Sequence, residues 1–136
     1  MQSKAVKAFK GRLKGYRYWQ DRLKGQSELM QMCYDLLGAS PKSPRFDDVQ
    51  AHGPKDLDRE YRIRAEIERI EPLLTRAKDE VGYMDEILGK IETPLREAVI
   101  AIYADEKQLR SMADKLGYSK SGLERKINQA IEKALN

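Results

Sequence analysis

Cysteine is almost missing from this chain of 136 residues, since Cys33 is the only one. A single cysteine permits no disulfide within the chain, so the sequence suits a reducing compartment. The chain also has no apolar run near the ~18 residues that a membrane-spanning helix needs, and its basic first residues lack the apolar core of a secretory signal. We therefore expect a protein of the cytoplasm that does not enter a membrane.

Aromatic residues are scarce as well, at 7% of the chain, whereas charged residues make up 35%. This composition is typical of long, solvent-exposed helices and predicts an all-α fold. The net charge of +4 is unevenly distributed, because residues 1–24 carry eight Lys or Arg against the single Asp21, while residues 57–92 carry seven basic and ten acidic side chains. The basic end predicts binding to a polyanion or an acidic partner; a solvated helix with surplus lysines is the plainer alternative.

The first segment, residues 1–37, has the hydrophobic pattern of a basic helix that packs against another helix. Its apolar positions alternate at spacings of three and four, with Gln20 and Ser27 in two of the places. Glycines weaken the helix, and we expect a bend near Gly25. The apolar and aromatic positions of this pattern are Val6, Phe9, Leu13, Tyr16, Leu23, Met30, Tyr34 and Leu37.

The periodicity stops in residues 38–56, where Pro41, Pro44 and Pro54 predict a loop that connects two helices. His52, the only histidine, lies in this segment. Base catalysis and metal binding both need partners beside a histidine, and the sequence places none nearby. No other group of His, Cys or carboxylates has the spacing of metal ligands or of an activated nucleophile, so we expect no enzyme, no metal and no cofactor.

The strongest periodicity lies in residues 57–92, where apolar side chains alternate at spacings of four and three and predict a coiled-coil helix. Pro72 lies inside this pattern and predicts a kink, which agrees better with the unbroken heptad phase than a split helix does. The narrow seam needs a partner, either the first helix folded back as an antiparallel hairpin or the same helix of a second subunit. We assign oligomerisation to Ile67, Ile70, Leu74, Val81, Met84 and Leu88.

The last segment, residues 93–136, is predicted to hold a DNA-binding head. Thr93 and Pro94 suit the N-cap and the first position of a short helix. Asp105 with Gln108 three residues later indicates a capping box for the helix that follows.

Residues 105–135 have the spacing of a helix-turn-helix. A small residue, Ala113, stands where the two helices would cross, and four residues later Gly117 can adopt the left-handed backbone of a sharp turn. The second helix is predicted to begin at Ser119 or at Ser121, of which Ser121 can form a capping box with Glu124. The residues to which we assign structural roles in this motif are Ala113, Leu116, Gly117, Tyr118, Leu123 and Ile127.

The exposed start of the second helix is the predicted DNA-reading surface, since residues at the beginning of a recognition helix reach base edges in the major groove. Arg125 suits bidentate hydrogen bonds to guanine, and Glu124 can accept from cytosine or orient Arg125. Lys120 and Lys126 suit phosphates. An ordinary helical hairpin with a charged outer face is the alternative. The predicted DNA-binding residues are Ser119, Lys120, Ser121, Glu124, Arg125, Lys126 and Asn128.

The run MADKLGYSKS at residues 112–121, followed by QAIEKAL at residues 129–135, resembles the promoter-reading helix-turn-helix of sigma factors. The whole layout is similar to phage late-transcription regulators of the ArpU and RinA type: a basic helix with aromatic residues, a Pro/Gly loop, a long helix of mixed charge and this head. The resemblance covers nearly the whole chain, but only the last ~45 residues carry specific motifs. It implies sequence-specific binding upstream of phage late genes and activation of the RNA polymerase of a bacterial host.

Together these patterns predict a cytoplasmic, all-α regulator of transcription that binds double-stranded DNA as a homodimer or a higher homo-oligomer. A coiled-coil adaptor that binds RNA polymerase or another phage protein without reading DNA is the main alternative. A small DNA-packaging subunit is a third. The sequence leaves open the operator, the direction of regulation, any effector, and whether the basic first helix contacts DNA or protein.

Overall fold

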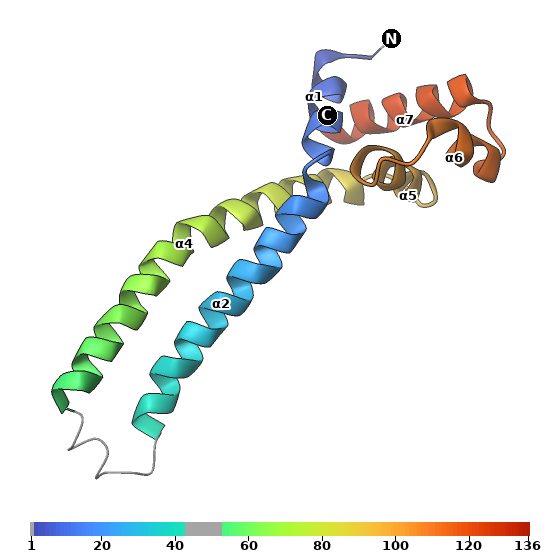
Figure 1. Ribbon diagram of the computed structural model, residues 1–136. Coiled ribbons are helices and arrows are strands. Elements are labelled where there is room, and N and C mark those ends of the chain that lie inside the picture. Colours follow the sequence, from blue (N-terminus) through green and yellow to red (C-terminus); the bar gives the residue numbers. More distant parts are fainter. Residues whose placement is uncertain (1, 43–52) are drawn as a thin grey trace. The chain divides into compact units, whose positions relative to one another are not determined.

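The computed structural model describes residues 2–42 and 53–136, and the elements of this described part are all helices joined by turns, without a strand (Figure 1). The predicted all-α class is confirmed. His52 and most of the predicted loop lie outside the described residues, while the helices on either side extend further into residues 38–56 than expected. The elements are α1 (Lys4–Leu13), α2 (Tyr16–Lys42), α4 (Gly53–Gly89), α5 (Leu95–Val99), the π-helix η1 (Ile100–Ala104), α6 (Leu109–Leu116) and α7 (Lys120–Leu135).

The chain divides into two compact units that cut across the segments delimited from the sequence. The head unit comprises Met1–Gln20 and Asp79–Asn136, and the hairpin unit is Asp21–Lys78. The hairpin unit is therefore an insertion in the head unit, and both ends of the chain belong to the head. This grouping makes the basic N-terminal helix α1 a neighbour of the C-terminal helix α7.

The first predicted helix is interrupted at Lys14 and Gly15, where the Gly15 amide bonds back to the carbonyl of Arg12 at 3.0 Å. The interruption does not lie near Gly25, where the sequence predicted a bend, since α2 continues through Gly25 without a break. At its start α1 is capped by Ser3, whose hydroxyl accepts from the Val6 amide at 3.2 Å.

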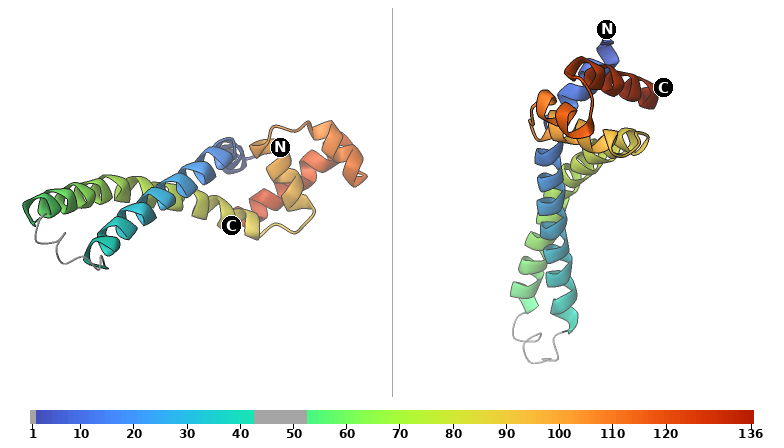
Figure 2. Two further views of the ribbon diagram at one scale, coloured as in Figure 1. Left: turned by 60° about the horizontal axis from the view of Figure 1, so that its bottom comes forward. Right: turned by 90° about the vertical axis from the view of Figure 1, so that its right-hand side faces the viewer.

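In the hairpin unit, α2 and α4 lie side by side and run in opposite directions (Figures 1 and 2). Their shared core consists of Met30 and Cys33 from α2 with Ile67 and Ile70 from α4. This arrangement resolves the choice left open by the sequence, because the heptad seam packs against the first helices of its own chain. Helix α4 is not split, since it continues through Pro72 as one element.

The seam residues to which oligomerisation was assigned pack inside the chain. In the hairpin unit Ile67 and Ile70 are buried and Leu74 is packed against them. In the head unit Met84 and Leu88 belong to the core, and Val81 is also buried. Any contact with a second copy would have to use other side chains.

The core of the head unit joins segments from both ends of the sequence. Helix α1 contributes one apolar face, the end of α4 a second and α7 a third, with α5, η1 and α6 closing around them. Each of the large side chains named below is at most 2% exposed. They are Val6, Phe9 and Leu13 from α1, Met84, Leu88 and Ile91 from and just after α4, and Leu123, Ile127 and Ile131 from α7.

The capping residues predicted for two helices, α5 and α6, are wrong. Pro94 follows a cis peptide bond and stands at the N-cap of α5 in place of Thr93, and no side chain caps that helix. Gln108 stands at the N-cap of α6, again without a side-chain bond, so the Asp105–Gln108 capping box is absent. Asp105 instead accepts from the Arg17 guanidinium at 2.8 Å, which lowers the pKa of the Asp105 carboxyl.

Candidate nucleic-acid interface

Helices α6 and α7 are packed against each other and joined by a tight turn at Gly117. Gly117 has φ 80° and ψ 24°, the left-handed conformation expected from the sequence. The amide of Tyr118 donates to the carbonyl of Ala113 at 2.9 Å, and the Gly117 amide donates to Asp114 at 3.3 Å. These two bonds form a Schellman motif, which satisfies carbonyls at the end of α6 and sets the direction in which the chain leaves it.

Ser119 is the N-cap of α7, which settles the choice between the two predicted serines. Its hydroxyl accepts from the Gly122 amide at 3.0 Å. A Cβ atom at position 122 would lie 2.7 Å from the Ser119 hydroxyl, so the glycine leaves room for the cap. Ser121 is free of this role and is exposed in the first turn of α7.

The structural residues predicted for this motif are mostly placed as expected. Ala113, Leu123 and Ile127 are at most 1% exposed, and Leu116 packs against the same core. Tyr118 is the exception, because its side chain is 40% exposed and does not lock the two helices together. The apolar face of α7 is therefore held by the residues within the helix and not by the tyrosine before it.

Six of the predicted DNA-binding residues are exposed, and one is engaged in a contact within the protein. Asn128 is half-buried and accepts a hydrogen bond through its Oδ1 from the Lys10 ammonium of α1. It is therefore used within the protein and is not free for a base edge. The exposed residues are Ser119, Lys120, Ser121, Glu124, Arg125 and Lys126.

Lys10 is a buried cation whose contacts join α1 to α7. Its ammonium donates to Asn128 and to the Gln2 side chain, and lies 4.8 Å from the centre of the Tyr103 ring. Burial lowers the pKa of Lys10, and the nearby Glu124 carboxylate opposes that shift. The Ser3 hydroxyl adds a second link, since it donates to the Glu132 carboxylate at 2.8 Å.

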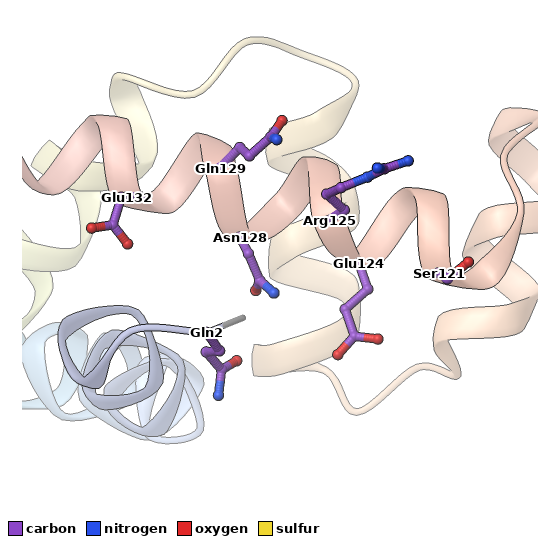
Figure 3. A pocket seen from close by; sticks show the side chains of 7 residues that line it. All are labelled: Gln2, Ser121, Glu124, Arg125, Asn128, Gln129 and Glu132. Carbon is purple, nitrogen blue, oxygen red and sulfur yellow. The ribbon is translucent and has the colours of Figure 1, made fainter.

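A polar groove runs between the N-terminal segment and α7 (Figure 3). Figure 3 shows Glu124 and Asn128 directed toward Gln2, whereas Arg125 and Gln129 point away from it. The outer edge of α7 thus presents a guanidinium and a carboxamide one helical turn apart, the groups that form bidentate hydrogen bonds to guanine and adenine. The groove is lined by Gln2, Ser121, Glu124, Arg125, Asn128, Gln129 and Glu132.

Sequence reasoning missed three residues of this groove, and the signals differ. Gln129 follows Arg125 by four positions, so the helical period alone places the two on one face. Glu132 likewise follows Asn128 by four positions on α7. Gln2 had no such signal, because its position beside α7 depends on the packing of α1 more than a hundred residues away in the chain.

Basic side chains that are exposed on α1 border this interface. By helical spacing, Lys7 and Lys14 lie on the same side of α1 as Lys10, which contacts α7, and both are exposed. Two other cations of the segment are paired, Arg12 with Glu80 at 3.0 Å and Arg17 with Asp105. The charges that this segment offers to a polyanion are therefore its exposed lysines and not Arg12 or Arg17.

No group of three His, Cys, Asp or Glu side chains within residues 2–42 and 53–136 could hold a metal ion. None of the helices in that part of the chain is both long and apolar enough to span a bilayer.

No match to this chain was found among models of protein families, among curated proteins or among solved structures.

Proposed function

We propose that this protein is a sequence-specific DNA-binding regulator of transcription in which α7 enters the major groove. The observation that carries the proposal is the left-handed turn at Gly117, which joins α6 to an α7 whose first two turns are exposed on one side and anchored in the core on the other. A helix-turn-helix needs these features, because its second helix must be rigidly held and open at its start. The proposed role is not enzymatic.

Arg125 is the proposed principal reader, with bidentate hydrogen bonds to guanine. Gln129, one turn further along the same face, would contact adenine, and Ser121 lies one turn before Arg125. Lys120 and Lys126 would neutralise phosphates on either side. Asn128 is removed from the reading set, because Lys10 occupies its carbonyl oxygen.

The N-terminal helix would add sequence-independent affinity. Lys4 and Lys7 are exposed on α1 and Lys14 at its C-terminal cap, and α1 packs on α7. Each phosphate that a cation neutralises releases counterions, so the logarithm of affinity should fall with the logarithm of salt concentration by about 0.9 per contact. Phosphate contacts from α1 would fix the register of α7 on the duplex.

The regulatory setting is proposed from the resemblance to phage late-transcription regulators: double-stranded DNA upstream of late genes as target, host RNA polymerase as partner, and the bacterial cytoplasm as location. One head of this size makes few contacts, so we propose that two copies bind together. The paired copies would associate through side chains outside the buried seam.

Selection of bound sequences from a random DNA pool tests the proposal directly. We expect one consensus, and a two-fold symmetric consensus for a dimer. Arg125→Ala should lower the preference for the consensus over a scrambled sequence by about 1–3 kcal/mol. Arg62→Ala removes an exposed arginine of the hairpin unit and is the matched control, with unchanged preference expected. Failure of selection to enrich any sequence would contradict sequence-specific binding.

A further inference from the structure

The hairpin unit has an apolar stripe on α2 that its own core does not use. Leu29, Met32 and Leu36 are 41%, 58% and 44% exposed. Their spacing of three and four places them in one row along the helix. The core with α4 uses the neighbouring face, which carries Met30 and Cys33. This row has no partner among the described residues of the hairpin unit, and rows of large apolar side chains in solvent commonly mark interaction sites.

The stripe has a negative border. Glu28 and Asp35 are seven positions apart, so they lie in a row along one edge of the stripe. Both are exposed, and neither forms an ion pair with another described residue. Residues 25–41 contain Glu28 and Asp35 but no Lys or Arg, although the whole chain carries a net charge of +4.

The facing helix of the same unit has a different surface. Near the start of α4 two acids pair with arginines in the next turn, Asp58 with Arg62 and Glu60 with Arg64. Such pairs neutralise one another locally. Beside the exposed apolar row of α2, in contrast, Glu28 and Asp35 form no ion pair with another described residue.

We propose that this face of α2 binds an amphipathic helix of another protein, one whose apolar stripe is bordered by Lys or Arg. The apolar row of α2 supplies the area to be buried, and the acidic border selects the charge of the partner and the register of the contact. The proposal concerns the hairpin unit alone and does not rest on DNA binding by the head unit.

A second copy of the chain fits this face poorly. Since residues 25–41 have no basic side chain, an α2 face laid on its own copy meets an equally acidic border. Like charges placed across a helical interface are destabilising. A polyanion such as DNA is disfavoured for the same reason, so a basic helix is the complementary occupant.

Two synthetic helical peptides test the proposal with the full-length chain. Both carry leucines at the first and fourth positions of each heptad; one has lysines and the other glutamates at the bordering positions. We expect the lysine peptide to bind at least about tenfold more tightly than the glutamate peptide at low salt. The difference should shrink as salt screens the exposed charges. Fluorescence anisotropy of the labelled peptides measures both affinities.

Three variants connect the binding to α2. Met32→Ser should weaken binding of the lysine peptide by about tenfold or more. Leu57→Ser, which changes a 69% exposed leucine of α4 outside the stripe, is the matched control and should leave it unchanged. The double variant Glu28→Lys with Asp35→Lys should reverse the preference between the two peptides. All these side chains are exposed, and circular dichroism would verify that each variant stays helical.

Several results would overturn the proposal. They are the absence of binding, equal affinity for both peptides, equal effects of Met32→Ser and Leu57→Ser, and self-association of the free chain that Met32→Ser abolishes in sedimentation. None of these results bears on the DNA selection experiment, so the two proposals fail separately.

Discussion

The ammonium of Lys10 in α1 donates a hydrogen bond to the side-chain oxygen of Asn128 in α7, across 118 positions of sequence. Lys10 is 7% exposed, and its ammonium also bonds to Gln2 and lies over the Tyr103 ring. The bond ties the proposed recognition helix to the opposite end of the chain. It follows that the last thirty residues are not an autonomous head, because α1 completes both their core and their polar edge.

Replacement of Lys10 by methionine should destabilise the head unit. Methionine keeps the apolar stem but leaves the oxygens of Asn128 and Gln2 without their donor, at a cost of about 1–3 kcal/mol in the free energy of unfolding. Trp19, the only tryptophan, packs against the head core, so its fluorescence during urea unfolding reports on this unit. Lys7→Met removes an exposed lysine one turn earlier and should cost much less. Equal midpoints for the two variants would show that the Lys10 contacts contribute nothing.

Gly117 and Gly11 form a matched pair of exposed glycines in the head unit. A Cβ atom at either position meets nothing within 4 Å, but only Gly117 has a positive φ, at 80°. Gly117→Ala should therefore destabilise by about 1 kcal/mol or more through backbone strain alone. Gly11→Ala lies inside α1 and should stabilise by up to about 1 kcal/mol. Opposite shifts of the unfolding midpoint are expected, and a stabilising Gly117→Ala would contradict the left-handed turn.

The Tyr16 hydroxyl donates to the Asp85 carboxylate at 2.5 Å, and burial together with this bond raises the pKa of Tyr16 to about 12. Because the folded pKa lies above the unfolded value of 10.0, this contribution to stability is complete below pH 10 and is lost as pH rises through 12. Tyr16→Phe should therefore lose stability at neutral pH but show a shallower decline above pH 10. Urea unfolding at several pH values measures the slope. Tyr61→Phe, at a side chain 73% exposed, should keep the slope of the parent protein.

Local patterns predicted the helices and turns of this fold better than they predicted which helices pack against each other. The heptad spacing in residues 57–92 and the small-residue and glycine positions at Ala113 and Gly117 depend on short-range rules, and the structure has helices and a left-handed turn there. The spacing of Val6 and Phe9 predicted a buried helix face but not that α7 would cover it. No local rule encodes a contact across more than a hundred residues.

Several side chains were misassigned for the same reason. Asp105 was expected to cap α6, yet its carboxylate pairs with Arg17, which tertiary packing brings beside it. Asn128 was expected to face DNA, yet the burial of Lys10 turns it inward. In the candidate site the helical period predicted which residues at the start of α7 are exposed. It did not predict that the N-terminal segment would cover Asn128.

The lysines of α1 should govern affinity without governing sequence preference. Lys10 is buried and paired, so the variant that tests phosphate contacts replaces exposed Lys4, Lys7 and Lys14 with glutamine and leaves Lys10 in place. If each contacts one phosphate, the slope of log affinity against log salt should fall by about 0.9 per lysine. The ratio of affinities for the selected and a scrambled sequence should stay constant, because phosphate contacts carry no base information. Titrations at four salt concentrations with both DNAs measure slope and ratio together. An unchanged slope would place α1 away from the DNA, whereas a changed ratio with an unchanged slope would mean that α1 acts by positioning α7.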